Sequence, residues 1–177
     1  MDQTQSIDAG AVAGLSMLGV MLTMAVYFEL RDGRIPNWLC LAGMAAGLLI
    51  GGLPGGITLR SSLVGLLIGF GFLFVFYMFG GVGGGDVKLM GATGALLGSD
   101  LIQPALFFMA VIGAIMALIA LVWSGKVRAG LEGVAYRLYL RKERGAMPAA
   151  SQSPPVTVPY GVAIAAGSLA ALCLRGI

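Results

Sequence analysis

The amino-acid sequence predicts an all-α membrane protein, a polytopic bundle of about six transmembrane helices with an amphipathic helix on the cytoplasmic surface. Of its 177 residues, 58% are hydrophobic and only 11% are charged, whereas about a quarter of the residues of a soluble globular protein are charged. The mean hydropathy of +0.94 indicates the same class. The length suits one domain, so we expect residues 1–177 to form a single transmembrane domain.

Six apolar runs approach the length of about 20 residues that a helix needs to cross a bilayer. They cover roughly residues 10–29, 37–52, 61–80, 88–99, 103–123 and 156–174. The flank of the first run contains Asp2 and Asp8 but no Lys or Arg, so we expect a mature helix rather than a secretory signal, which starts with basic residues. The second and fourth runs are short and rich in glycine, which favours tight packing through small residues or a tilted position. SDLIQP, residues 99–104, predicts the turn between the fourth and fifth runs.

A more polar segment separates the last two runs. Residues 126–145, KVRAGLEGVAYRLYLRKERG, mix Leu, Val and Tyr with Arg and Lys. This mixture predicts an amphipathic helix that lies on the membrane surface. The following MPAASQSPP is typical of a flexible polar linker. The surface helix and linker together are expected at about residues 124–155.

The positions of Lys and Arg predict the orientation, because cytoplasmic loops carry the excess of basic residues. With six spans and both termini on one side, nine of the eleven basic residues fall in loops on the other side. These nine are Arg31, Arg34, Lys88, Lys126, Arg128, Arg137, Arg141, Lys142 and Arg144. We therefore expect both termini outside the cytoplasm. The same bias accounts for the pI near 9.1, so no nucleic-acid partner is expected.

The composition also limits the chemistry. The chain contains no histidine, and its two cysteines, Cys40 and Cys173, lie in apolar runs. The lack of histidine removes a histidine-based triad and most zinc chemistry, and two thiols without further partners indicate neither a disulfide framework nor a metal site. We expect no metal and no cofactor, so any catalysis must depend on carboxylates, hydroxyls, lysine or thiols.

The segment GGVGGGDVKLMG, residues 80–91, places Asp86 and Lys88 beside the membrane directly after the third run. An ionisable residue at membrane depth is costly and by default indicates a functional site. Asp86 also suits a helix N-cap. Lys88 either extends toward the headgroups, tunes nearby carboxylates or holds a substrate. Gly83 and Gly85 lack side chains, so an extended chain and a water molecule could approach the backbone closely.

A second acidic site lies at the end of the first run. Glu29 and Asp32 are expected at the same cytoplasmic boundary as Asp86, so a carboxylate from each helix can converge when the helices pack. Two carboxylates that share a site repel each other, so one stays protonated as an acid while the other, ionised, activates water. This arrangement suits peptide hydrolysis.

These motifs resemble those of the type IV prepilin peptidases, membrane aspartyl proteases of the GxGD class. GGGDVKLMGATGALLG, residues 83–98, resembles the GxGD motif; ELRDGRIPNWL, residues 29–39, resembles the other aspartate motif; VTVPYGVAIAAG, residues 156–167, resembles the last span. The resemblance covers nearly the whole chain in order and spacing. It is greatest to the small Flp, or Tad-system, peptidases, because neither the long cysteine-bearing insert nor the methyltransferase domain of bifunctional members is evident.

The resemblance implies an aspartic endopeptidase of a single transmembrane peptidase domain. It implies cleavage between the basic leader and the hydrophobic helix of type IVb or Flp prepilins, at the cytoplasmic face of the bacterial inner membrane. The implied catalytic pair is Asp86 and the carboxylate at position 29, with Gly83, Gly85 and Lys88 supporting the motif. The partners implied are the prepilin and the lipid bilayer.

One residue departs from the family pattern, because Glu29 stands where the family has its first catalytic Asp, seven residues before Pro36. Three interpretations remain open: Glu29 serves as a lengthened first carboxylate, Asp32 replaces it from a position that shares the helix face, or cleavage is reduced or absent. Two other classes of function also remain, a small transporter or channel, which glycine-rich short helices and buried acids would suit, and a non-catalytic pilus-assembly component.

Overall fold

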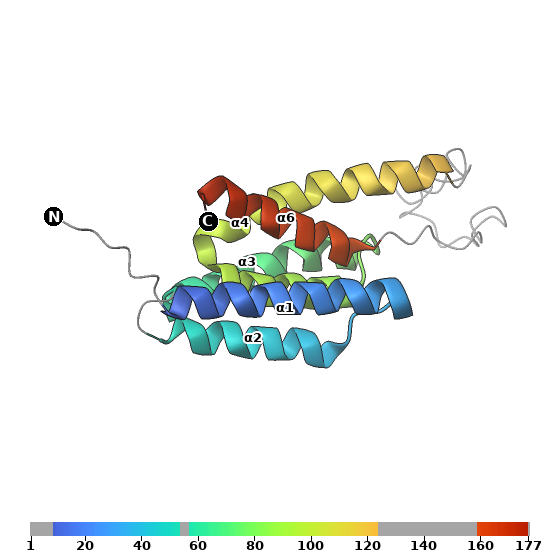
Figure 1. Cartoon of the computed structure of the whole chain (residues 1–177). Coiled ribbons are helices and arrows are strands. Elements are labelled where there is room, and N and C mark those ends of the chain that lie inside the picture. The colour runs from blue at the N-terminus through green and yellow to red at the C-terminus, as the bar shows by residue number, and fades with distance from the viewer. Residues whose placement is uncertain (1–8, 54–56, 124–158, 177) are drawn as a thin grey trace. The chain divides into compact units, whose positions relative to one another are not determined.

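The computed structural model describes residues 9–53, 57–123 and 159–176, and this part of the chain contains helices and no strand (Figure 1). The helices are α1 (Ala9–Asp32), α2 (Asn37–Gly51), α3 (Leu59–Met78), α4 (Gly84–Trp123) and α6 (Tyr160–Arg175). The all-α class predicted from the sequence is therefore confirmed. The predicted surface helix and linker, at about residues 124–155, lie outside the described residues.

The chain divides into two compact units, one of residues 1–112 with 159–177 and the other of residues 113–158. Of the second unit the structure describes residues 113–123, the end of α4. The first unit contains all the other helices and every candidate site residue. That the whole chain forms one peptidase domain stays a prediction.

Three helical segments are long and apolar enough to cross a membrane, Gly10–Asp32, α3 and α4. The other two, α2 and α6, are apolar but shorter. The expected six transmembrane helices are not found as six elements, because five helices are assigned within the described ranges. The fourth and fifth predicted runs both fall inside α4, and a break within α4 explains the difference.

The break lies at Gly98, where φ is 76° and ψ is 179°. This backbone conformation is open essentially only to glycine. The turn expected at residues 99–104 is therefore displaced, and Pro104 stands inside the helix that follows. Two contacts hold the break against α3: the backbone N–H of Ser99 donates to Ser61 Oγ at 2.9 Å, and the two serine hydroxyls lie 3.0 Å apart.

The chain reverses direction at this break. Before it, α4 runs antiparallel to α3, since Met90 lies against Gly69 in the middle of α3 and Gly94, one turn later in α4, lies against Gly65, one turn earlier in α3. After it, the stretch up to Ile112 returns along α6, with Met109 packed against Gly167. Within the first unit, Figure 1 shows the two stretches of α4 running in opposite directions. The fourth predicted run and the fifth as far as Ile112 therefore correspond to two antiparallel stretches of one assigned helix.

The first stretch of α4 forms the centre of the first unit, and residues 89–98 are all buried. Small residues make this close packing possible. A Cβ atom added at Gly47 of α2 would lie 2.7 Å from the Cβ of Ala95, and one added at Gly43 would lie 3.2 Å from that of Ala92. Helices that meet through small residues approach backbone to backbone. This packing places the first turn of α4, which carries Asp86, beside the other helices of the unit.

Candidate active site

Asp86 lies in the first turn of α4, which begins at Gly84, and its side chain is buried, with 8% exposed. Its Oδ2 accepts a hydrogen bond from the backbone N–H of Gly83 at 3.2 Å. A carboxylate that reaches back to the residue before the helix stabilises the helix start. A Cβ atom added at Gly83 would lie 3.0 Å from the same oxygen. The glycine therefore leaves room for the buried carboxylate.

Glu29 lies in the last turns of α1 and reaches the N-terminus of α6. Its Oε1 accepts a hydrogen bond from the backbone N–H of Gly161 at 3.1 Å. Free N–H groups and the helix dipole make a helix N-terminus a favourable place for a carboxylate. The other oxygen, Oε2, is buried and has no hydrogen-bond partner among the residues that the structure describes. One oxygen is thus anchored, and the other is buried with its hydrogen-bonding capacity unused among these residues.

The surroundings of the two carboxylates share one residue, Ile35 of the loop after α1. A Cβ atom added at Gly85 would lie 3.3 Å from the Cβ of Ile35, and one added at Gly161 would lie 3.5 Å from its Cδ1. Ile35 therefore lies beside both the glycine that precedes Asp86 and the glycine that binds Glu29. Residues from α1, α4, α6 and the loop after α1 meet at one place.

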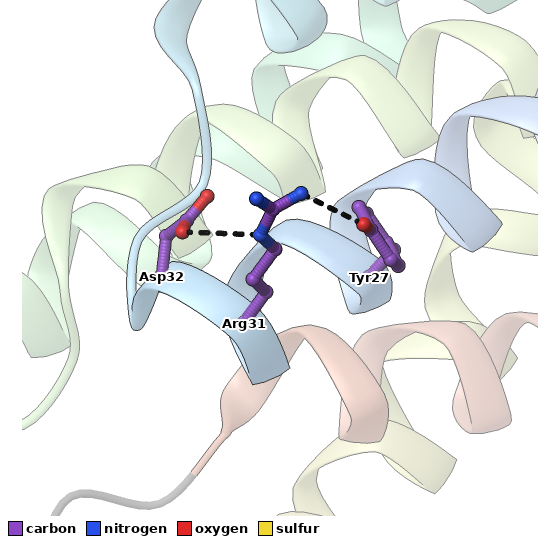
Figure 2. Close-up of polar contacts among 3 residues, drawn as sticks. All are labelled: Tyr27, Arg31 and Asp32. Atoms are coloured by element: carbon purple, nitrogen blue, oxygen red, sulfur yellow. Dashed lines mark hydrogen bonds and ion pairs between the residues drawn. The ribbon is translucent and has the colours of Figure 1, made fainter.

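Asp32, the alternative first carboxylate, has different surroundings. Its Oδ1 lies 3.8 Å from Nε of Arg31, and the two side chains are 56% and 65% exposed. Arg31 also donates from Nη1 to the hydroxyl of Tyr27 at 2.9 Å. Figure 2 shows this arrangement of Tyr27, Arg31 and Asp32 at the end of α1. Asp32 is thus in an exposed ion pair, whereas Glu29 is half-buried against α6.

Lys88 connects two of the sequence motifs. Its Nζ donates to Oδ1 of Asn37 at 2.9 Å, which ties the first turns of α4 to the first residue of α2. Cys40 lies nearby, with its Sγ 3.9 Å from the carbonyl oxygen of Gly85. The lysine that the sequence placed beside Asp86 is therefore bonded to the amide of the IPN motif.

The site can support acid and base catalysis with its own side chains. Two interacting carboxylates favour the state in which one is protonated and the other ionised. The ionised group can take a proton from water while the protonated group donates one. Within the described ranges, no group of three or more His, Cys, Asp or Glu side chains is placed to hold a metal ion.

Sequence reasoning missed three residues of this site: Ile35, Asn37 and Gly161. Each stands inside a motif that the sequence did single out, RIPN or VPYG. Each motif as a whole indicated a functional segment, but its amino-acid sequence does not show which of its atoms contact a carboxylate. The hydrogen bond between Gly161 and Glu29 joins residues 132 positions apart, so local patterns could not reveal it.

A match to a known protein family covers both carboxylates. Residues 16–118 match the model of the type IV leader peptidase family. The chain is 30% identical, over 128 residues, to a prepilin leader peptidase/N-methyltransferase of Burkholderia pseudomallei (strain 1026b), with 68% of this chain and 41% of the relative covered. It is 36% identical, over 107 residues, to a Bacillus subtilis (strain 168) protein of the same name, with 59% and 42% covered. The chain thus spans less than half the length of these relatives, and no solved structure gives a significant match.

Proposed function

The chain belongs to the type IV leader peptidase family, and from this premise we propose that it is a prepilin leader peptidase of the aspartic type. It hydrolyses the peptide bond between the basic leader and the hydrophobic helix of a type IVb, or Flp, prepilin. The observation that supports the proposal best is that Glu29 and Asp86, at the helix ends that carry the family motifs, are gathered around one residue, Ile35.

The proposed reaction uses the pair and one water molecule. The ionised carboxylate takes a proton from water as the water oxygen attacks the scissile carbonyl carbon, and the protonated carboxyl group donates its proton to the carbonyl oxygen. The tetrahedral intermediate then collapses with cleavage of the C–N bond: the first group gives its proton to the leaving amine, while the second group, now ionised, takes a proton from a hydroxyl of the intermediate as the carbonyl reforms. The pair ends with one proton, on the same group as at the start.

We propose Glu29, in preference to Asp32, as the first carboxylate. Glu29 is half-buried beside the N-terminus of α6 and gathered with Asp86 around Ile35, whereas Asp32 is exposed and paired with Arg31. A catalytic carboxylate must share a water molecule with its partner, so Glu29 is the better candidate.

The loop before α4 leaves room for the substrate to approach Asp86. Gly80, Gly81 and Gly83 are exposed, and a backbone without side chains lets an extended peptide lie close to Asp86. The excess of Lys and Arg near the ends of α1 and α4 supports a cytoplasmic position for this loop and an outside position for both termini. The protein is then a multi-pass protein of the bacterial inner membrane.

Orientation can be tested by cysteine labelling in cells. In a variant without Cys40 and Cys173, a cysteine at Arg34 should resist a membrane-impermeant reagent added from the periplasm, while one at Thr58 should react. The two positions lie at opposite ends of α2. The reverse labelling pattern would overturn the proposed orientation.

The activity is tested with the full chain, purified in detergent or nanodiscs, and a prepilin that carries a basic leader, a glycine and a hydrophobic helix. Mass spectrometry should detect the free leader and the mature pilin. The matched substrate control is the same pilin with its leader lysines and arginines replaced by glutamine, which should be cleaved more slowly. Absence of cleavage in every prepilin that the protein binds would contradict the proposal.

That negative outcome corresponds to a second candidate, a non-catalytic component of pilus assembly. The observation that favours it is the Glu at position 29, because an added methylene shifts a carboxylate and catalysis tolerates little displacement. Such a protein would bind prepilin with the affinity of a peptidase and leave it intact.

A further inference from the structure

We infer that Gly161 is a positioning residue that holds the carboxylate of Glu29 and sets the length of acidic side chain that position 29 can use. The inference rests on the proposed function, because it assigns a task to a residue of the same site. Its starting observation is the 3.1 Å hydrogen bond from the backbone N–H of Gly161 to Oε1 of Glu29. Gly161 touches the carboxylate and would act on the substrate only through it.

Space explains why this residue is glycine. A Cβ atom added at Gly161 would lie 2.5 Å from Oε2 of Glu29 and 3.2 Å from its Cδ. The first distance is shorter than any contact that a real side chain makes, so a methyl group would displace the carboxylate. The same atom would lie 3.5 Å from Cδ1 of Ile35, an ordinary contact. A side chain at position 161 and the present position of the Glu29 carboxylate therefore exclude each other.

Backbone conformation does not require this glycine. The described glycines with positive φ are Gly33, Gly80, Gly98 and Gly176, whereas Gly161 lies in the first turn of the α6 helix. Alanine is a better helix former than glycine, so helix stability alone would favour alanine at this position. Glycine at position 161 thus lowers the helix propensity of this turn but leaves the space that the Glu29 carboxylate occupies.

The geometry also matches the length of glutamate. The bond to Gly161 is 3.1 Å long, close to the upper end of the usual N–H to O range of about 2.7 to 3.2 Å. Aspartate is shorter by one methylene, or about 1.5 Å of chain, and from the same backbone position would lose this bond. From the sequence alone, the methylene that Glu29 has in addition to the family's Asp suggests a misplaced carboxylate. The structure indicates instead that the N-terminus of α6 binds the carboxylate in this position.

The second carboxylate oxygen of Glu29, Oε2, indicates what the hydrogen bond from Gly161 achieves. Oε2 of Glu29 is buried and unpartnered among the described residues, and a buried acceptor without a partner is unfavourable unless something binds it. With Oε1 held by Gly161, rotation of the carboxylate is restricted, and Oε2 keeps one direction. Gly161 would in this way present Oε2 to the water molecule or proton that the pair shares with the substrate.

A double-mutant cycle on prepilin cleavage tests the positioning role. Gly161→Ala and Glu29→Asp should each lower kcat by about 10²-fold, the effect of misplacing a catalytic group by about 1 Å, with little change in KM. The double variant should be no slower than either single variant, because both changes break the same contact. Gly19→Ala is the matched control, since a Cβ atom there meets nothing within 4 Å, and it should leave kcat unchanged.

Thermal unfolding in detergent tests the contact without relying on activity. Gly161→Ala should lower the melting temperature of the parent, because the methyl group displaces the carboxylate. In a Glu29→Ala background the same substitution should raise the melting temperature, because the obstacle is gone and alanine favours the helix. A shift of the same sign and size in both backgrounds would overturn the contact itself.

The outcomes separate this inference from the proposed function. If the parent cleaves prepilin, Glu29→Gln does not, and Gly161→Ala has the kcat of Gly19→Ala, the positioning role is wrong while the proposed function stands. If Glu29→Gln cleaves as fast as the parent, the proposed pair is wrong. If no variant cleaves but the unfolding shifts have opposite signs, the contact stands and the role in catalysis is overturned.

Discussion

Two acidic residues at the end of α1, Glu29 and Asp32, lie three positions apart and have opposite surroundings. Glu29 is half-buried, bound to the N-terminus of α6 and gathered with Asp86 around Ile35. Asp32 is exposed and forms an ion pair with Arg31. Spacing alone puts them on a common helix face, so the difference comes from what packs against that face. Partners distant in the sequence, rather than the local pattern, decide which acid joins the site.

The largest effect is expected at Asp86, the group common to every interpretation of the pair. Asp86→Asn should remove cleavage, because an amide can neither activate water nor cycle a proton, while prepilin binding persists. Leader release by mass spectrometry and pull-down of intact prepilin measure the two properties. Asp100→Asn is the matched control, an exposed acid that lies just after the break at Gly98. Cleavage by Asp86→Asn at an appreciable fraction of the parent rate would remove Asp86 from the mechanism.

The second largest effect is expected at Glu29, and it tests the contrast between Glu29 and Asp32 directly. Glu29→Gln should lower kcat by about 10² to 10⁴, the usual contribution of a positioned acid or base. The amide keeps the shape of the side chain and an oxygen for Gly161, so the melting temperature should change little. A large loss of stability with normal kcat would mean that Glu29 only fastens α1 to α6.

A moderate effect is expected where Lys88 meets Asn37. Lys88→Met should remove their 2.9 Å hydrogen bond and lower kcat/KM several-fold, because the bond helps to position the first turn of α4. Asn37→Ala should have a similar effect, and the double variant should add little to either. Additive losses would instead indicate that the lysine has a separate role, such as direct contact with the substrate.

The smallest effect is expected in the exposed cluster of Figure 2. Asp32→Asn should change kcat by less than about twofold and stability by less than about 1 kcal/mol, since exposed ion pairs contribute little. Cleavage assays and thermal unfolding measure both. If Asp32→Asn abolished cleavage while Glu29→Gln did not, the contrast would be reversed and Asp32 would be the first carboxylate.

Much of the fold could be predicted because apolar runs and glycine clusters mark helices and their ends. The runs at 10–29, 37–52 and 61–80 lie close to α1, α2 and α3. The break in α4 was expected a few residues too late, because polar residues and Pro104 favour a turn, whereas only Gly98 can adopt the required conformation. Hydrophobicity also could not show that the stretch rich in small residues, 88–99, would be central rather than lipid-facing.

The candidate site, like the fold, could be predicted only in part from the sequence. Asp86 and Glu29 stand out in the sequence because charges at membrane boundaries are rare. The sequence favoured Glu29 but left Asp32 open as an alternative, since a helical face cannot be oriented without its neighbours. Gly161 was visible only as part of a motif, and its contact depends on α1 and α6 packing together.

Because the N-terminus of α6 anchors the carboxylate of Glu29, the parts of the site come together in a fixed order during synthesis. Chains emerge from the ribosome N-terminus first, at about 5–20 residues per second, so Glu29 and Asp86 enter the membrane well before residue 161. The N–H group that anchors Glu29 comes from the last described helix, Tyr160–Arg175. A nascent chain that has not yet reached Gly161 therefore holds both acids but lacks the anchor of one of them. Hydrolytic competence would arise only after α6 has been synthesised and has docked.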